Sequence, residues 1–491
     1  MGTINSAMSL IGGALDADQD ALSVVANNVA NANTAGYTDE KPDWQENAPI
    51  TVGGIQIGDG VTETGATSQR DRVLEERLDQ QQQIAAASSA RLASLNNIQA
   101  LLTPDSGSSS ATAGDIGSDI TNFFDAFSSL ESDPTDNALR EQVLSSASTL
   151  AGDISSAANS LNGQSAALSQ NATGIASQVN SLTGAIAQLN LEIESTSPDA
   201  DAGTLEDERQ QDLSQLSQLI GINQVATENN GLSITTTSGQ LLVSEGESFQ
   251  LTTGTVDGAT DFFLGGTDIT SQLASGGGQL GGYLTARDQD IPSALNSLNQ
   301  IAYYISTQVN TDNNAGVDAE GNTGAPVAGS ITGAWTLDIF SPPPTYAANL
   351  ASDGTDTSGA AAAMTVVMTD PNQIAAASAG NGTGDNSNAV TMAGIANQAI
   401  VDEQTPVNFY SNFVSTLGSM VSEVQAENTA QNASVTQLQT QNNALSSVNL
   451  NDEAAAMSTL ETSYQAASQV FTLLNTLMAS ALNLGEETTV S

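Results

Sequence analysis

Two short stretches contain residues whose types and spacing could bind a ligand, and the first is rich in glycine. Gly276, Gly278 and Gly281 match G-x-G-x-x-G, a spacing that lets the backbone approach the pyrophosphate of a dinucleotide. Such a site also needs a strand before the glycines and an acidic residue about 20 positions later. Residues 271–275 do not have the pattern of a strand. We therefore interpret the glycines as a flexible turn, with nucleotide binding as the alternative.

The second stretch, residues 312–324, is a loop whose polar residues share side-chain oxygens: Asp312, Asn314, Asp318, Glu320 and Asn322. The calcium loop of an EF-hand has Gly at its sixth position and Glu at its twelfth. Neither the frame that begins at Asp312 nor the one that begins at Asp318 supplies both residues. We interpret the stretch as a solvated loop, with a weak calcium site as the alternative.

The commonest catalytic side chains are missing, because the chain has neither His nor Cys. Without them no Ser-His-Asp triad, Cys-His pair or zinc site can be built. Lys41 is the single lysine, and its neighbours do not indicate a buried amine. The sequence thus predicts a protein that is not an enzyme, with no catalytic residue, no cofactor and no metal site.

The charge balance limits the partners that the chain can have. With 8 basic and 55 acidic residues, its net charge is -47, which we interpret as adaptation to an acidic or salty medium. Phosphate groups would be repelled, so we expect neither nucleic acid nor a membrane as a partner. No apolar run reaches the ~18 residues that span a bilayer. The first basic residue, Lys41, comes too late for the basic start of a cleavable signal peptide.

The two ends of the chain share one helical pattern. Residues 4–37 carry two interleaved seven-residue series, which include Met8, Ile11, Leu15, Leu22, Val25 and Val29. Residues 457–478 carry another series, which consists of Met457, Leu460, Tyr464, Ala467, Phe471, Leu474 and Met478. Alternating steps of three and four residues place each series on one helix face, as in a coiled coil. Since a single helix with such a stripe is marginal alone, we predict that the two ends pair.

The pattern changes its period in the middle of the chain. Helical patterns cover residues 70–102, 137–195, 205–221 and those after about 390, and strand patterns cover 222–264, 335–340 and 363–369. The sequence predicts an α+β, multidomain fold. Both chain ends and the internal coiled-coil helices form a long antiparallel helical bundle, into which a β-rich outer domain is inserted. The predicted domains are 1–66 with 447–491 (inner core), 67–220 with 372–446 (helical bundle) and 221–371 (β-rich).

Residues 26–37, with the sequence ANNVANANTAGY, resemble the N-terminal signature of flagellar axial proteins, which include rod, hook and hook-associated proteins. Asp39 stands where hook-associated members often carry a basic residue. Further stretches resemble the family of flagellar hook-associated protein 1, in the same order along the chain: 205–219, 278–288, 309–310 with 316–324, 370–377, 384–386, 449–453 and 464–467. Rod and hook proteins resemble that family only at the two ends.

This resemblance implies a structural adaptor at the junction between the hook and the filament of a bacterial flagellum. The implied partners are sister copies in a homo-oligomeric ring, the flagellar hook protein, a second hook-associated protein with the filament, and a cytosolic export chaperone. The implied location is extracellular, on the flagellum, after type III export without a cleavable signal peptide.

The resemblance and the helical stripes together give the candidate site residues. The predicted assembly interface comprises Met8, Ile11, Leu15, Leu22, Val25, Asn28, Val29, Asn31, Gly36, Tyr37, Leu460, Tyr464, Phe471 and Leu474. The predicted chaperone contacts are Leu460, Tyr464, Phe471 and Leu474. Two alternatives remain: a hook or rod subunit, which would lack the matches at 205–219 and 278–288, and an exported enzyme with its activity on residues 222–369.

Overall fold

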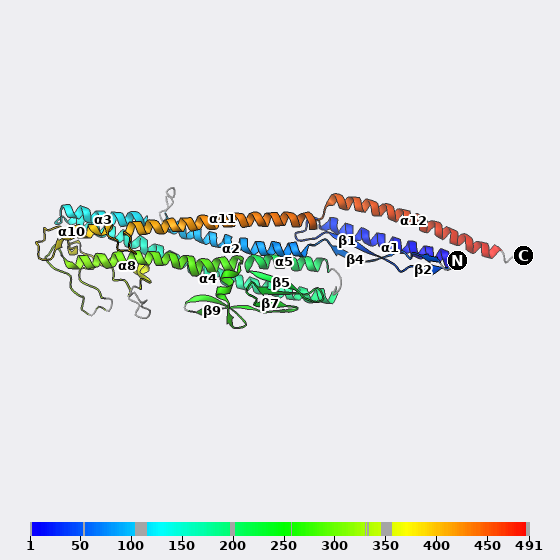
Figure 1. The fold of residues 1–491 in the computed structure, drawn as a ribbon, viewed down its shortest axis with the longest axis horizontal. Helices are drawn as coiled ribbons and strands as arrows, with labels where there is room; N and C mark the ends of the chain where they lie inside the picture. Colours follow the sequence, from blue (N-terminus) through cyan, green and yellow to red (C-terminus); the bar gives the residue numbers. More distant parts are fainter. Residues whose placement is uncertain are drawn as a thin grey trace.

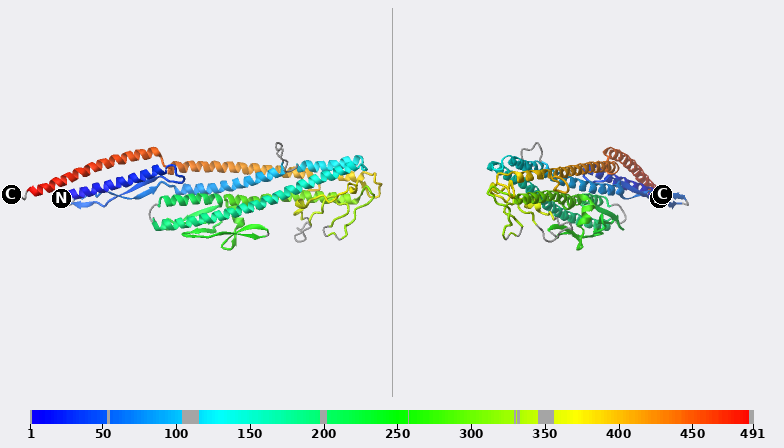
Figure 2. Two further views of the ribbon diagram at one scale, coloured as in Figure 1. Left: turned by 180° about the vertical axis from the view of Figure 1, so that it is seen from behind. Right: turned by 60° about the vertical axis from the view of Figure 1, so that its left-hand side comes forward.

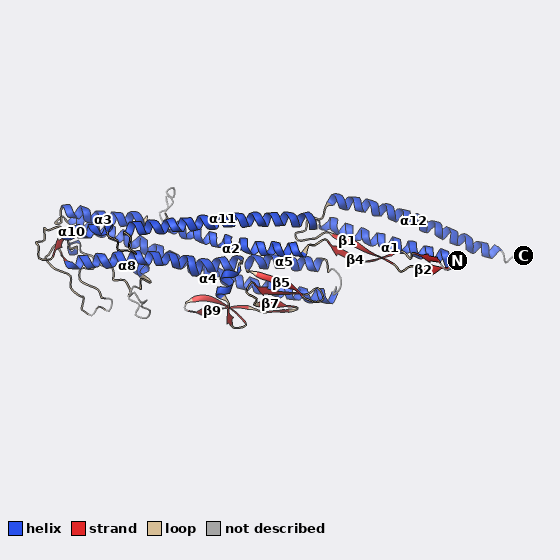
Figure 3. Cartoon of the chain, viewed as in Figure 1, coloured by secondary structure: helices blue, strands red, loops and turns tan. Residues whose placement is uncertain are grey.

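The computed structural model describes residues 2–52, 55–103, 115–196, 202–256, 258–328, 330, 333–344 and 356–487. The molecule is a long rod, and both chain ends lie at the same end of it (Figure 1, Figure 2). Most of its length is helix, and the longer strands lie along one side of the rod and beside the terminal helices (Figure 3). The predicted α+β fold, with paired chain ends and strands inserted between internal helices, is confirmed.

The helices are long at both ends and in the centre of the chain. They are α1 (Gly2–Asn31), α2 (Arg72–Leu102), α3 (Ile116–Ser132), α4 (Asn137–Thr196), α5 (Thr204–Leu219), α6 (Thr270–Gly276), α7 (Gly278–Thr285), α8 (Ile291–Ala315), α9 (Ala360–Ala363), α10 (Ser387–Gly394), α11 (Pro406–Ser446) and α12 (Leu450–Glu487). A π-helix, η1 (Ala286–Asp290), joins α7 to α8, and short 3₁₀ helices occur as η2 (Pro371–Gln373) and η3 (Ile395–Asn397).

Local caps fix where the central helices begin. Asp71 precedes α2, and its Oδ1 accepts hydrogen bonds from the backbone N of Val73 (3.1 Å) and Leu74 (3.0 Å). Thr405 precedes α11 in the same role, and Pro406 occupies the first helical position, where no amide proton is needed. These caps satisfy amide groups that have no partner inside the helix.

The strands form small antiparallel sheets. β1 (Glu40–Glu46) pairs with β4 (Val61–Ser68) along α1, and β2 (Ile50–Val52) pairs with β3 (Ile55–Ile57). In the middle of the chain, one sheet contains β5 (Ile222–Ala226), β6 (Leu232–Thr236), β7 (Leu241–Ser244) and β8 (Glu247–Ser248). A second contains β9 (Leu251–Val256), β10 (Ala259–Leu264) and β11 (Thr267–Asp268). The short pair β12 (Gly316–Val317) and β13 (Ala377–Ser378) lies after α8.

Two hydrophobic cores hold the body of the rod together. The first lies far from the chain ends and joins α2, α3, α8 and α11 to the first half of α4; its centre includes Phe123, whose ring lies 5.5 Å from that of Phe340. The second joins the other half of α4 to α5, α7 and the sheets, through residues such as Val179 and Phe262. Because α4 belongs to both cores, it makes the body one continuous unit.

Polar pairs set the register between α2 and α11. Asn428 and Gln431 occupy apolar-seam positions of α11 in the predicted coiled-coil pattern. Asn428 Nδ2 donates to Ser88 Oγ (3.1 Å), and Gln81 Nε2 donates to Gln431 Oε1. Such pairs match at one alignment of the two helices, so they favour one register over its neighbours.

The prediction of strands at residues 335–340 and 363–369 is wrong. Only isolated bridges occur there, and α9 occupies part of the second stretch. Amide side chains of α8 take the place of a neighbouring strand: Asn310 Oδ1 accepts from the backbone N of Ile339 and Phe340, both at 3.0 Å. Asn313 Nδ2 donates to the carbonyl of Leu337 at 2.6 Å. The segment therefore satisfies its backbone without forming a ladder.

The predicted domain boundaries stay a prediction. The strands β5 to β11 lie within residues 222–268, whereas α8, which also lies within the predicted β-rich range, packs in the first core. None of the helices in the described ranges combines the length and the apolar content that crossing a bilayer requires.

Candidate functional site

The paired chain ends form a thin unit at one tip of the rod. The helix α1 packs against α12 on one side and against β1 and β4 on another, and α1 and α12 run antiparallel (Figure 1). Within the described residues, the hydrophobic side chains that this unit buries are Ala17, Ala21 and Val25, all from α1. Because so little apolar surface is removed from water, the unit has a small core of its own.

The structure brings the predicted interface residues of the two helices together. On α1, Met8, Ile11, Leu15 and Leu22 are half-buried, Val25 and Asn28 are buried, and Val29 is 40% exposed. On α12, Leu460, Phe471 and Leu474 are half-buried, and Tyr464 is 38% exposed. On α12 the half-buried residues recur at three-and-four spacing, as expected for the stripe that faces α1, whereas α1 is half-buried throughout residues 10–15, where it has neighbours on more than one side.

Asn28 is the polar centre of this unit. Its Nδ2 donates to Asp39 Oδ1 (2.9 Å), to the carbonyl of Glu40 (2.8 Å) and to Glu453 Oε2 (3.2 Å). Its Oδ1 accepts from Tyr37 Oη (2.8 Å) and from the backbone N of Glu40 (3.2 Å). One buried amide thus ties α1 to the start of β1 and to the first turn of α12.

The remaining predicted residues shape the turn that follows α1. Asn31 Nδ2 donates to Asn27 Oδ1 (2.8 Å), and Asn31 Oδ1 accepts from Thr34 Oγ1 (3.2 Å). Gly36 has a φ of +82°, a conformation that other residues rarely adopt. This turn directs Tyr37 back toward Asn28.

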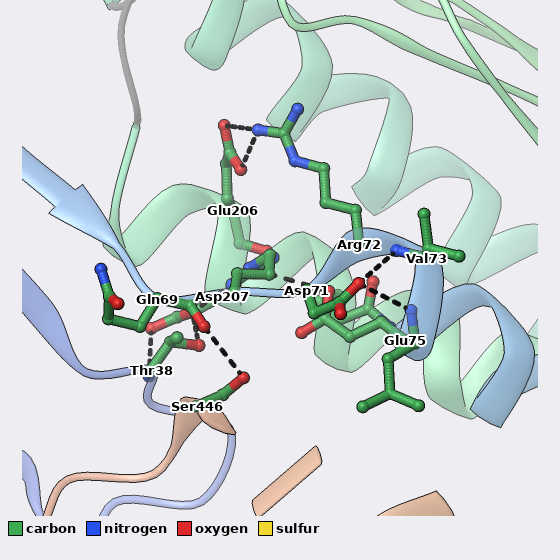
Figure 4. A network of polar contacts seen from close by, with 12 residues as sticks. Thr38, Gln69, Asp71, Arg72, Val73, Glu75, Glu206, Asp207 and Ser446 are labelled. Carbon is green, nitrogen blue, oxygen red and sulfur yellow. Dashed lines mark hydrogen bonds and ion pairs between the residues drawn. The ribbon is translucent and has the colours of Figure 1, made fainter. Parts of the chain in front are cut away.

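A network of charged residues joins the terminal unit to the body (Figure 4). Arg70, between β4 and α2, forms an ion pair with Asp207 of α5, and its Nη1 donates to the carbonyl of Glu206 (2.8 Å). Asp207 also accepts from Thr38 through the backbone N (3.1 Å) and Oγ1 (2.8 Å). Arg72 pairs with Glu206 at 2.8 Å. We call this region, residues 36–40, 69–75, 206–211 and 446–449, the joint.

Backbone bonds complete the joint. The amide of Asp39 donates to the carbonyl of Ser446 (2.8 Å), and the amide of Gln69 donates to the carbonyl of Asp39 (2.8 Å). Ser446 Oγ donates to the carbonyl of Gln69 (3.2 Å). Three distant parts of the sequence therefore meet at one point.

Buried carboxyl groups gather around the joint. Burial raises the pKa of Asp39, Asp207 and Glu453 above the usual range, and for Asp207 the effect of Arg70 opposes the rise. Burial raises the pKa of Glu75 to about 7, although Arg70 opposes it, and the pKa of Asp79 to about 6. Ionising these groups therefore costs free energy in the folded state.

The sequence patterns missed two features of this region. The joint pairs residues more than a hundred positions apart, such as Arg70 with Asp207, and no local pattern predicts that pairing. The other feature is a second apolar stripe on α12: Val470 (43% exposed), Leu473 (60%) and Leu477 (50%). Its three-and-four spacing is visible in the sequence, but it lies one position away from the series at Leu460, Phe471 and Leu474.

The glycine-rich stretch has a packing role in this structure. Gly278 begins α7 with a φ of +70°, and a Cβ there would lie 2.4 Å from the Cα of Ile220. A Cβ on Gly282 would lie 2.3 Å from the carbonyl oxygen of Ala87 on α2. The glycines let α7 approach α2 and the end of α5 closely.

The carboxylates of the 312–324 stretch bond within the protein. Asp318 Oδ1 accepts from the backbone N of Glu320 (2.9 Å) and Asn322 (2.7 Å), and Asp312 Oδ2 accepts from Gln308 (2.9 Å). Across the part of the chain that the structure describes, no group of three or more acidic side chains is placed to hold a metal ion. Asp312 itself belongs to the last turn of α8, so the first residues of the predicted loop are helical.

Comparisons with known proteins agree with this geometry. The model of the flagellar hook-associated protein FlgK helical domain matches residues 105–327, and that of the flagella basal body rod protein matches residues 8–38. The chain is 25% identical to flagellar hook-associated protein 1 of Escherichia coli and 26% identical to that of Salmonella typhimurium, over 98% of this chain and 99% of each relative. The relative in Bacillus subtilis is 25% identical over 96% of both chains.

A solved structure has a similar fold. The flagellar hook junction protein FlgK from Burkholderia pseudomallei matches 74% of this chain and 99% of its own, with a TM-score of 0.60 and 20% sequence identity. The likeness concerns the fold, over about three quarters of this chain.

Proposed function

We propose that this chain is the structural adaptor that joins the hook of a bacterial flagellum to the filament, because it is similar to flagellar hook-associated protein 1 along nearly its whole length. The observation that carries the proposal is the match over 98% of this chain and 99% of its relatives. A protein that shared only the terminal helices would match at the ends alone.

We propose that the terminal unit is the assembly interface. Its two helices bury few apolar side chains within one copy, and α12 leaves Val470, Leu473 and Leu477 exposed. Burying exposed apolar side chains against neighbouring copies stabilises an assembly by about 1.5–3 kcal/mol for each large residue. The predicted residues Met8, Ile11, Leu15, Leu22, Val25, Asn28, Val29, Asn31, Gly36, Tyr37, Leu460, Tyr464, Phe471 and Leu474 hold α1, α12 and the turn in place for these contacts.

In this proposal the copies form a homo-oligomeric ring on the hook. One face of the ring contacts the hook protein, and the other receives a second hook-associated protein and then the filament. The body of the rod and its sheets form the outer part, and the terminal unit forms the inner part. The location is extracellular, and the protein acts by binding, without catalysis.

We also propose type III export and a chaperone that covers α12 before assembly. The half-buried residues Leu460, Phe471 and Leu474 become available if α12 separates from α1, and Tyr464 is already 38% exposed. Titration calorimetry with the purified export chaperone of the same organism measures this binding. We expect Leu460→Ala with Phe471→Ala to weaken it at least tenfold, whereas Asp125→Asn on α3 leaves it unchanged.

Deletion of the gene tests the adaptor function. Electron microscopy of the deletion strain is expected to show hooks without filaments, and the full-length gene is expected to restore the filaments. Loss of the hooks themselves would instead support a hook or rod subunit. The rod-family match is confined to residues 8–38, which does not favour that alternative.

A further inference from the structure

A polar cleft lies beside the joint, between α2, α5 and α11. Its volume is about 350 Å³, and most of the residues that line it have polar side chains. Its lining includes carboxylates and side-chain amides: Glu75, Asp79, Asp207, Gln210, Gln439 and Asn442. A cleft of this size holds several water molecules or a hydrated ion.

Asp79 is the buried carboxylate of this cleft that lacks a full set of partners. Asp79 as a whole is only 2% exposed. Oδ2 accepts from Gln210 Nε2 (3.0 Å) and Gln224 Nε2 (2.9 Å), whereas Oδ1 has no hydrogen-bond partner among the described residues. The amide oxygen of Asn442, which lines the same cleft, also has none there.

The cleft holds more negative charge than the protein neutralises there, and Asp79 is the carboxylate that has no cationic partner among the described residues. Arg70 serves the other two carboxylates: it forms the ion pair with Asp207, and its Nε lies 3.7 Å from Glu75 Oε2. Asp79 has amide donors but no ion-pair partner in the described residues. A buried carboxylate in this position either takes up a proton or attracts a cation.

We propose that the cleft binds one monovalent metal cation, Na⁺ or K⁺, with Asp79 Oδ1 as its charged ligand and amide oxygens and water as the neutral ones. Hard cations of this kind prefer oxygen ligands. A single charge matches the one carboxylate of the cleft that has no cationic partner among the described residues. A divalent ion would need several acidic ligands, and the described residues contain no group of three that could supply them.

The surroundings of Asp79 determine when the cation can bind. Glu75 and Glu76 on α2 act on it with negative charge, and Asp207 of α5 lines the same cleft, where Arg70 pairs with Glu75 and Asp207. The helix α11 and the strand β5 contribute amides. Burial raises the pKa of Asp79 to about 6, so the group is mainly ionised above that pH. The cation and the proton therefore compete for the same carboxylate. This inference does not depend on the proposed function.

Thermal unfolding of the full chain tests the site. Samples in NaCl, KCl and choline chloride at equal ionic strength share the same general screening, but the methyl groups on the nitrogen of choline keep carboxylate and amide oxygens from binding its charge directly. We expect the metal salts to raise the midpoint by about 2 °C over choline chloride at about pH 8. Asp79→Asn is expected to abolish this difference, and Asp125→Asn, the same exchange on the exposed face of α3, is expected to keep it.

Three results would overturn the proposal. The first is a midpoint difference between the metal salts and choline chloride that is as large in Asp79→Asn as in the unaltered protein. The second is the lack of any such difference in the unaltered protein. The third is an Asp79-dependent rise of the midpoint in CaCl₂ that exceeds the rise in NaCl. If Asp79→Asn does not fold, the unaltered protein at about pH 5 decides the question. The difference must vanish there, because Asp79 is protonated while most exposed carboxylates still carry charge. A rubidium anomalous peak beside Asp79 Oδ1 in crystals would locate the ion.

Discussion

Asn28 on α1 and Glu453 on α12 stand 425 positions apart in the sequence, yet Asn28 Nδ2 donates a buried hydrogen bond of 3.2 Å to Glu453 Oε2. The same nitrogen donates to Asp39 at 2.9 Å, so one amide binds two neighbouring carboxylates whose pKa values burial raises. The paired chain ends are thus held by buried hydrogen bonds where α12 begins, and by apolar stripes along the rest of their length.

Replacing Asn28 by Asp is expected to break the hydrogen bonds that Asn28 donates and to weaken the contact between α1 and the start of α12. The new side chain cannot donate, and it places a third carboxylate beside Asp39 and Glu453. Losing buried hydrogen bonds to charged groups costs about 1–3 kcal/mol. Limited proteolysis should therefore cut the region around residues 447–449 faster. Asn27→Asp, on the exposed side of the same helix turn, should change little; an equal effect of both variants would contradict the role given to Asn28.

Hydrogen exchange on the purified monomer is expected to separate the terminal unit from the body. Residues 4–29 and 457–478 should exchange fast, because the unit buries few apolar side chains. Residues 143–168 of α4, which lie in the first core, should exchange slowly and provide the internal reference. Equal protection of both regions in a monodisperse monomer would show that the ends are stable without neighbours.

Replacing Leu473 by Glu is expected to block assembly without unfolding the chain. Leu473 is 60% exposed, so the monomer loses little, but an interface would have to bury the new charge. We expect hooks without filaments in cells that carry this variant, and an unchanged circular dichroism spectrum of the protein. Gln469→Glu adds the same charge at another exposed position of α12 and is the control. Normal filaments with Leu473→Glu would remove this stripe from the interface.

The stability of the chain is expected to rise as the pH falls from about 8 to about 5. Glu75 and Asp79 have folded-state pKa values of about 7 and about 6, above the values near 4 of the unfolded chain. The folded state therefore binds more protons in this window, and protonation stabilises it, by on the order of 2 kcal/mol. Urea unfolding at several pH values measures the effect, and Asp79→Asn should flatten the slope. A stability that increases with pH would contradict the assignment.

Gly282→Ala is expected to destabilise the contact between α7 and α2. The added Cβ would lie 2.3 Å from the carbonyl oxygen of Ala87 and 2.8 Å from the Cβ of Ala90, so backbone must move. Overpacking of this kind costs about 1–3 kcal/mol. Gly184→Ala on α4 has open space around it and should stabilise the chain slightly, which urea unfolding can resolve.

Helix periodicity predicted much of the fold but little of the joint. The end of α2 at Leu102 and the length of α4 agree with the patterns, because seven-residue repeats and caps are local signals. The segment near Phe340 was predicted as a strand from its own pattern. The amides of α8 that hold it lie about 30 positions earlier and have no periodic signature, so the pattern could not reveal them. The contacts of Arg70 with Asp207 and of Asn28 with Glu453 depend on tertiary structure in the same way.

The chain passes between the terminal unit and the body twice, once from β4 into α2 and once from α11 into α12, and the two passes touch where Ser446 Oγ donates to the carbonyl of Gln69. A unit that is connected by a single segment of the chain can rotate about that segment. A unit that is connected by two segments, hydrogen-bonded to each other, resists rotation. Torque applied to one end of this rod is therefore carried across the joint to the other end rather than lost in free rotation.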